Sequence, residues 1–211
     1  MQNIITSIVS NDTLHAKWLN TLSYLENVGA RKIAACQNPY MVDLTMLKHA
    51  AEEHRHAYYL KKQLHKLNTK TCEYYDSKDL FAPILSKQYL QKLDLASSHY
   101  LKEIIGVQST ELRFLSYLFV TYAIELRADV LYPMYQEVLS RLKSKVMVKS
   151  IIIEEEGHLE EMIHMLSKFD NDWQRHISPL LKLEEELFSD WFKEVSKEVV
   201  AHESFARGMA D

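Results

Sequence analysis

The sequence predicts an all-α protein, a four-helix bundle with one long crossover and additional helices in the crossover and at the C-terminal end. Three observations lead to this prediction. Only 4 of the 211 residues are glycine and 4 are proline, so few residues interrupt a helix. Apolar residues recur at spacings of three and four, which is typical of helices with one buried face, and alternating strand-like runs are missing. Two of the connections are short, which favours antiparallel helical hairpins.

The first hairpin is predicted over residues 13–67. A helix is expected over 13–36, since Pro39 follows it closely. A second helix should begin after Asp43, a residue type that commonly caps helix N-termini, and end near Leu67. The short connection between the two helices means that they should run antiparallel.

A long crossover, residues 68–108, separates this hairpin from the next. It contains Pro83 and a predicted helix of its own near 86–105. The third core helix is expected over 109–143, with Pro133 as a place where it can kink. A crossover of this length allows the second hairpin to return beside the first.

The fourth core helix is predicted over 145–169, a short connection after the third. A last helix, or a pair of helices, is expected over 173–206 around Pro179. We interpret residues 1–211 as a single helical domain, because a chain of this length has enough material for one sizeable core.

Composition excludes several classes of function. The net charge of −4 and a pI of about 6.2 give no electrostatic support for nucleic-acid binding. No apolar run has the length of a membrane span, and the first residues are too few and too polar for a signal peptide. Cys36 and Cys72 form no CxxC motif, which indicates a reducing compartment. We therefore expect a cytoplasmic protein with no membrane partner.

The segment IIIEEEGHLEEMIHML, residues 151–166, combines many carboxylates with an apolar helical stripe. Helical spacing places Glu155 and His158 inside that stripe, whereas Glu161 and His164 belong to a polar face. A buried ionised carboxylate is costly unless it is paired or binds a metal. The segment thus predicts a buried Glu-x-x-His pair with a specific partner.

The other three core helices show the same feature. In the second helix, Glu53 and His56 lie in the apolar stripe, again as Glu-x-x-His. Glu26 lies in the centre of the stripe of the first helix, and Glu125 in that of the third. Each core helix therefore buries one carboxylate near its middle, and the second helix of each hairpin adds a histidine.

The spacing of these carboxylates predicts that they meet. Glu53 follows Glu26 by 27 residues and Glu155 follows Glu125 by 30, which returns an antiparallel partner to the same height along a bundle. Four carboxylates balance the charge of two divalent cations, whereas without metal four like charges would share a dry interior. The alternative is an ordinary set of buried Glu–His ion pairs. The sequence favours a dinuclear metal site.

The order Glu, Glu-x-x-His, crossover, Glu, Glu-x-x-His over residues 26–158 resembles the ferritin-like di-iron carboxylate superfamily. The resemblance implies a ferritin-like bundle and two iron ions, with manganese as the alternative metal. It also implies six ligands by position: Glu26, Glu53, His56, Glu125, Glu155 and His158.

Two further features resemble the O2-activating branch of that superfamily. Each Glu-x-x-His pair is preceded by a second acid, Glu52 or Glu154, at a place where those families hold a carboxylate that orients a ligand histidine. The run Glu53-His54-Arg55-His56 is similar to their Glu-x-Arg-His form, which adds Arg55 to the expected surroundings of the site. The alternative for both acids is a solvated helix charge.

Residues near Glu125 are candidates for catalytic roles beside the metals. Glu125 itself, with Glu155, is expected to change its mode of metal binding during oxidation. Tyr122 and Tyr132, one and two turns away, could relay an electron or donate a hydrogen bond, and Asp129 could support a ligand. For the tyrosines, ordinary core packing is the alternative.

The function implied is that of a non-haem di-iron oxidoreductase, an oxygenase or oxidase that activates O2 to oxidise a small organic substrate. Gly29 and Ala128, each one turn from a ligand, leave room for O2 or a substrate carbon. Because the chain has no CxxC module, an external electron donor is expected. The alternatives are a peroxide- or O2-scavenging oxidase, a dimanganese catalase, and a non-catalytic protein that binds or senses iron. A homodimer is compatible with each of them.

Overall fold

The computed structural model describes residues 1–38, 40–69 and 72–208, and within them the chain forms helices and no strand. Seven α-helices occur in these ranges: α1 (Gln2–Val9), α2 (Asp12–Cys36), α3 (Leu44–Gln63), α4 (Pro83–Tyr100), α5 (Ser109–Arg141), α6 (Lys149–Phe169) and α7 (Trp173–Gly208). The all-α prediction is confirmed. No helix among these residues has both the length and the apolar character needed to cross a membrane.

The first hairpin, α2 and α3, begins at two capped N-termini. The side chain of Asn11 accepts hydrogen bonds from the amides of Thr13 and Leu14, and caps α2. Asp43 caps α3 in the same way, as its residue type predicts. The α-helical part of α3 ends at Gln63, and a 3-10 turn continues it to Lys66.

The crossover carries α4, which begins at Pro83 rather than near residue 86. Proline suits the first turn of a helix because its missing N–H group would have no partner there. A π-helical turn, Leu101–Ile105, extends α4, and Gly106 ends it with φ of 84°. Before α4, Asn20 of α2 holds the crossover by donating to the carbonyl oxygens of Tyr74 and Asp79.

The second hairpin consists of α5 and α6, and α7 follows it. α5 continues through Pro133, and α6 begins at Lys149, four residues later than predicted. α7 is one continuous helix through Pro179 rather than a pair. Pro133 and Pro179 each remove one internal hydrogen bond, a local cost that long packed helices can absorb.

The helix α1 is absent from the sequence-based prediction. Eight residues are too few to form a stable helix alone. In the protein, Ile5 and Ile8 of α1 are fully buried, and the helix packs against α2 and α5. Tertiary packing therefore stabilises a helix that local propensity would leave marginal.

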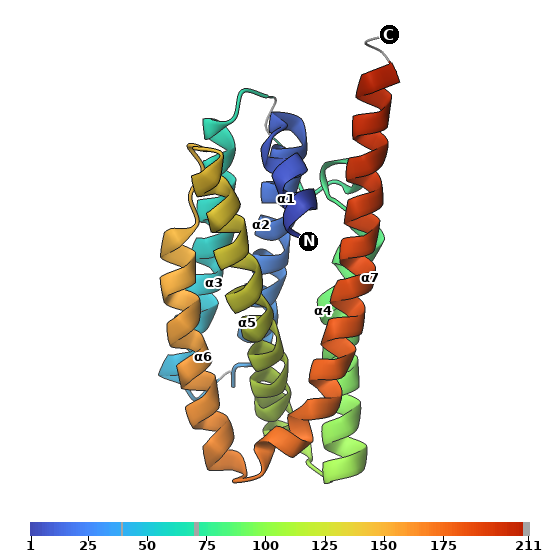
Figure 1. Ribbon diagram of the computed structural model, residues 1–211. Coiled ribbons are helices and arrows are strands. Elements are labelled where there is room, and N and C mark those ends of the chain that lie inside the picture. The colour runs from blue at the N-terminus through green and yellow to red at the C-terminus, as the bar shows by residue number, and fades with distance from the viewer. Residues whose placement is uncertain (39, 70–71, 209–211) are drawn as a thin grey trace.

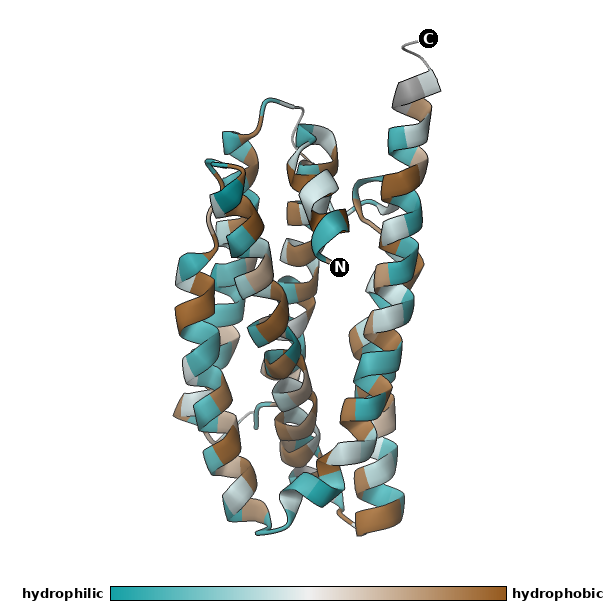
Figure 2. Ribbon diagram, in the orientation of Figure 1, coloured by the Kyte–Doolittle hydropathy of each residue, from teal (hydrophilic) through white to brown (hydrophobic). Residues whose placement is uncertain are grey.

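The helices form two neighbouring groups (Figure 1). On one side α3 and α6 lie next to each other, on the other side α4 and α7 do, and α2 and α5 lie between the two groups. Hydrophobic and hydrophilic residues are interspersed along the helices (Figure 2), a pattern typical of helices that bury one face and expose another. The inner faces of α2, α3, α5 and α6 enclose one space, and the side chains in it form the site described next.

Candidate metal centre

Six residues from four helices meet in the interior, in two overlapping groups. One group consists of Glu26, Glu53, His56 and Glu155, and the other of Glu53, Glu125, Glu155 and His158. In each group one candidate ligand atom per residue lies within 4.8 Å of all the others. We call these six residues the Glu–His cluster. They are the six that the sequence pattern singled out.

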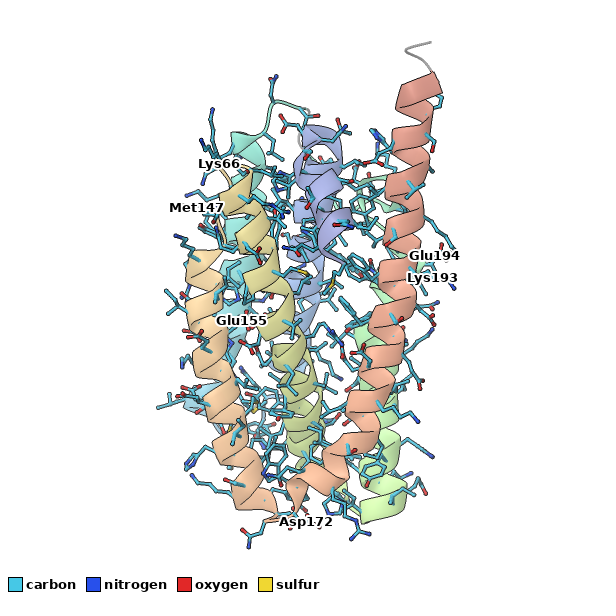
Figure 3. All side chains as sticks on the ribbon, viewed as in Figure 1. Lys66, Met147, Glu155, Asp172, Lys193 and Glu194 are labelled. Atoms are coloured by element: carbon cyan, nitrogen blue, oxygen red, sulfur yellow. The ribbon has the colours of Figure 1, made fainter. Side chains whose placement is uncertain are left out.

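Helical geometry brings the cluster together. In α3 and in α6 the glutamate and the histidine are three residues apart, so both point from the same face. Glu155, labelled in Figure 3, lies near the middle of the molecule's length. Glu53 and Glu155 belong to both groups and are central to the cluster. Each of the two groups has one further carboxylate and one histidine.

The two histidines present one ring nitrogen to the cluster and leave it without a hydrogen bond. His56 Nδ1 lies 3.0 Å from Glu155 Oε1, and His158 Nδ1 lies 3.4 Å from Glu125 Oε1. Both Nδ1 atoms are buried and make no hydrogen bond to any of the described residues. Buried polar atoms are nearly always partnered, so two such nitrogens at one place indicate a group that binds them.

The other ring nitrogen of each histidine is held by a carboxylate from the opposite hairpin. His56 Nε2 is 2.8 Å from Glu154 Oε2, and His158 Nε2 is 2.7 Å from Glu52 Oε2. When Nε2 carries the proton and donates it to the carboxylate, the lone pair of Nδ1 is free to bind a metal ion. The sequence predicted both acids near the site, but not that each acid would hold the histidine of the opposite hairpin.

Arg55 lies across the two acids at the surface. Its Nη2 atom is 2.6 Å from Glu154 Oε2 and 3.5 Å from Glu52 Oε1. The arginine therefore links α3 to α6 on the outer side of the histidines. Since Arg55 is half exposed, we expect it to orient the acids more than to stabilise the fold.

The electrostatics of the cluster favour bound cations. Burial, with repulsion from Glu155 added, raises the pKa of Glu53 and of Glu125 well above their usual range. Burial opposes charge on His56 and His158 too, but the surrounding carboxylates outweigh it and raise the pKa values of these histidines to about 8 and about 11. The carboxylates thus draw positive charge into the cluster, and protons supply it when no metal is bound.

The donor set fits divalent metal ions. Carboxylates and imidazoles together are ligands that first-row divalent metal ions accept. A self-contained set of Glu–His ion pairs would leave the two Nδ1 atoms without hydrogen bonds. The Glu–His cluster could therefore hold metal, and the ion-pair alternative accounts for it less well.

The tyrosine at the cluster is Tyr132, not Tyr122. The hydroxyl of Tyr132 donates to Glu26, and its ring is buried. Tyr122 instead packs edge-on against Trp173, with ring centroids 5.0 Å apart, and no hydrogen bond joins it to the cluster among the residues that the structure describes. The prediction of a catalytic role for Tyr122 is not supported by this placement, because α5 turns that side chain toward the start of α7.

Asp129 is also placed away from the predicted role. Its side chain is exposed to solvent, and within the described ranges it makes no hydrogen bond or ion pair to the cluster. Asp129 follows Glu125 by about one turn of α5, but its side chain lies on the outer surface of that helix. The predicted support of a metal ligand by Asp129 is therefore not seen in this placement.

Sequence reasoning missed a second histidine layer beside the cluster. His49, one turn before Glu53, is buried, and its ring centroid lies 4.5 Å from that of His158. His49 Nδ1 is 2.7 Å from the Tyr117 hydroxyl, and Nε2 is 2.7 Å from Glu161 Oε2. The signal was present, because residues 49, 53 and 56 share one helical face. Glu161, predicted on a polar face, supports this buried histidine.

A cavity of about 110 Å³ adjoins the cluster on the side of α2 and α5. Glu26, Glu53, Glu125 and Tyr132 are among the residues that line it, and apolar side chains make up most of the others. The cavity also touches Gly29, where an added Cβ atom would lie 3.8 Å from Glu53 Oε2. Gly29, which was predicted to leave room beside a metal-ligating residue, therefore faces the cluster.

Comparisons of this chain with protein-family models, with curated proteins and with solved structures found no match.

Proposed function

We propose that this protein is a ferritin-like dinuclear metal oxidoreductase that uses O2 to oxidise a small organic molecule. The observation that carries the proposal is the apolar cavity whose lining includes three carboxylates of the Glu–His cluster, Glu26, Glu53 and Glu125. A metal-binding cluster alone suits storage, sensing or catalysis. A cavity that leads to it suits a reaction in which a molecule other than O2 must approach the metals.

The helical arrangement supports the ferritin-like part of the proposal. The two hairpins, α2 with α3 and α5 with α6, face each other across the cluster, and α4 lies in the connection between them. Each hairpin contributes one glutamate from its first helix and a Glu-x-x-His pair from its second. This is the arrangement of helical carboxylate proteins that bind two iron or two manganese ions.

In this proposal, Glu26, Glu53, His56 and Glu155 would hold one metal ion, and Glu53, Glu125, Glu155 and His158 would hold the other. Two Fe(II) ions, when bound, would supply the electrons that reduce O2. The chain's own part is to hold the donor atoms in place and to keep water and unwanted reductants away.

Several side chains orient the donors from outside. Glu52 and Glu154 fix the ring planes of His158 and His56 by accepting from Nε2. Tyr132 donates its hydroxyl proton to Glu26 in a hydrogen bond and so orients that carboxylate. Since no cysteine pair suited to electron transfer is present in the sequence, the second electron pair would come from an external donor or from the substrate.

The first test is metal stoichiometry. Protein loaded anaerobically with Fe(II) should bind two ions per chain, and the doubly substituted E53A/E155A protein should bind fewer. H158A should weaken binding strongly, whereas H164A is the matched control, because His164 lies on the exposed face of the same helix. Full loading of the E53A/E155A protein, or equal losses in both histidine variants, would refute the site.

The second test separates the proposed oxidoreductase from the alternatives. Fe(II) is added in air, unbound iron is removed by desalting, and iron and O2 uptake are measured. Saturation near two irons with rapid O2 consumption and a transient near-ultraviolet or visible absorption band supports the proposal. Retention of far more than two irons would indicate a store. Rapid turnover of peroxide by the manganese-loaded protein, without O2 uptake by the iron form, would indicate a dimanganese catalase.

A further inference from the structure

The cavity beside the Glu–His cluster lies mainly between the α2/α5 pair and the α4/α7 pair. Its walls come from α2 and α5 on one side and from α4 and α7 on the other, with Leu90 of α4 and Phe188 and Trp191 of α7 among them. In Figure 1, α4 and α7 lie together along α2 and α5, on the side away from α3 and α6. The two extra helices therefore have a defined role, because they enclose this space.

The cavity meets the cluster on its carboxylate side. Glu26, Glu53 and Glu125 line it, whereas His56 and His158 do not. Glu26 is the most accessible of the six side chains, with 14% exposed, compared with 1% for His158. The histidines are instead closed off by Glu52 and Glu154. A molecule in the cavity thus approaches the cluster from the face opposite the imidazoles.

Both basic side chains at the cavity wall are already neutralised. Arg127 makes a two-point contact with Glu184, at 2.8 and 2.7 Å, and a further one with Glu185. Lys32 forms an ion pair with Asp94. An anionic ligand would have to break one of these pairs to gain a partner.

The environment of Arg127 fixes it further. Tyr89 donates a hydrogen bond to Glu184, and the guanidinium lies 3.9 Å from the centroid of the Phe188 ring. Binding of a cationic ligand is disfavoured too. The carboxylates available at the wall belong to the cluster, and metal ions would compete for them. With metal ions bound to the cluster, the described residues of the wall therefore offer no free charge of either sign to a ligand.

The cavity volume limits how large a ligand can bind without substantial movement of the walls. About 110 Å³ is somewhat less than the roughly 150 Å³ apolar cavity that accepts benzene in a well-studied engineered protein. A single aromatic ring or a short alkyl group fits such a space with small adjustments of the walls. A long chain, or a molecule with several polar groups, does not.

From this geometry we infer that the cavity binds a small, uncharged, mainly hydrocarbon molecule, and that this is the substrate class of the enzyme. The second half of the inference rests on the proposed function, whereas the first half concerns binding only. Ala128 and Gly29, which line the cavity, then determine how large a ligand can approach the carboxylates.

Binding can be tested on the full chain loaded with redox-inert Zn(II), without any turnover. Three probes of similar shape are compared by calorimetry and by thermal unfolding: toluene, benzoate and benzylammonium. Toluene should bind and raise the unfolding temperature, and each charged probe should bind at least tenfold more weakly. Benzoate or benzylammonium binding as tightly as toluene would overturn the inference, and so would the absence of toluene binding.

The position of the ligand is tested with two cavity variants and one control. A128L should weaken toluene binding at least tenfold by filling the cavity. G29A is a milder change, whose added methyl group meets only ordinary van der Waals contact, so it should fold and weaken binding less. A201L adds the same leucine at an exposed position of α7 and should leave toluene binding unchanged. Unchanged binding in both A128L and G29A would place the ligand elsewhere and overturn the inference.

These outcomes are independent of the proposed function. If toluene binds as expected but the iron-loaded protein consumes no O2, the oxidoreductase proposal fails and the apolar binding site remains. If O2 is consumed but no uncharged probe binds, the metal chemistry remains and the inferred substrate class is wrong.

Discussion

At the scale of single residues, the roles of the two ring nitrogens of each cluster histidine are divided. Nδ1 faces the cluster without a hydrogen bond, and Nε2 is held by an acid from the other hairpin, Glu154 for His56 and Glu52 for His158. This division sets the tautomer that a metal ligand needs. It also makes each hairpin depend on the other for the orientation of its histidine.

The first prediction concerns these supporting acids. E52Q and E154Q should each lower metal affinity by about 10–100-fold, because the amide is a weaker acceptor than the carboxylate for the histidine N–H group. Affinity is measured by competition with a chelator. E156Q is the matched control, because Glu156 is exposed on the same helix as Glu154. An equal loss in all three variants would mean that overall charge, not orientation, determines the affinity.

The second prediction concerns His15, which lies outside the cluster. His15 is buried with its Nε2 atom 2.6 Å from the Tyr135 hydroxyl, and burial lowers its pKa to about 4 although Asp12 opposes the shift. The unfolded chain takes up this proton near pH 6.5, so its contribution to stability is complete above that pH. It is lost as pH falls from 6.5 toward 4, by about 3 kcal/mol.

The H15Q variant tests this directly. Glutamine can keep a hydrogen bond to Tyr135 but cannot titrate, so the free energy of unfolding should fall less steeply between pH 6.5 and 4 than in the parent protein. Urea denaturation at a series of pH values gives the two slopes, with H164Q at an exposed position as the control. Parallel slopes for H15Q and the parent would show that His15 is not held neutral.

At the scale of helices, two glycines have opposite roles. Gly157 lies inside α6, and an added Cβ atom there would meet nothing within 4 Å. Gly106 ends the π-helical turn after α4 with φ of 84°, where an L side chain is strained. The first glycine costs helix stability without using its conformational freedom, whereas the second uses that freedom.

The third prediction follows from this contrast. G157A should raise the free energy of unfolding by about 0.5–1 kcal/mol, and G106A should lower it by about 1 kcal/mol or more. Both values come from urea denaturation of the metal-free protein. A gain in stability from G106A would contradict the left-handed conformation at this position, and a loss from G157A would mean that α6 needs a glycine close to His158.

At the scale of the whole molecule, the interior combines an apolar core with a charged cluster. Trp18 of α2 packs against Tyr135 of α5 and Trp191 of α7, and Trp191 donates a hydrogen bond to Ser86 of α4. These contacts bury a large apolar area and stabilise the bundle. The Glu–His cluster acts in the opposite direction when no cation is bound, because it places four carboxyl groups in the interior.

The fourth prediction is that metal removal destabilises the protein. Each ion bound only by the folded state adds about 2.7 kcal/mol when its free concentration is 100 times its dissociation constant. Thermal unfolding with Fe(II) or Mn(II), and after chelation, should therefore show a large loss of stability on chelation. The E53A/E155A protein should show little difference. If the parent protein is equally stable with and without metal, the cluster is a self-contained set of ion pairs.

The main helices and the members of the Glu–His cluster could be predicted from the sequence alone. The periodicity of apolar residues predicted the main helices, and it placed all six members of the Glu–His cluster on inner faces, because helical geometry relates sequence spacing to direction within one element. Helical spacing does not predict which side chains of different helices contact each other. Only the tertiary structure shows that Glu52 and Glu154 each hold the histidine of the opposite hairpin. It also shows that Tyr132, rather than Tyr122, donates to Glu26, and that Asp129 is exposed.

The tertiary structure also decided what surrounds the cluster. α1 forms because Ile5 and Ile8 are buried against other helices, and the cavity exists because α4 and α7 pack along α2 and α5. Arg127, on the wall of that cavity, pairs with Glu184, 57 residues further along the chain. Such contacts depend on the relative rotation and height of whole helices, which the packing of many side chains determines together and which no local spacing in the sequence expresses.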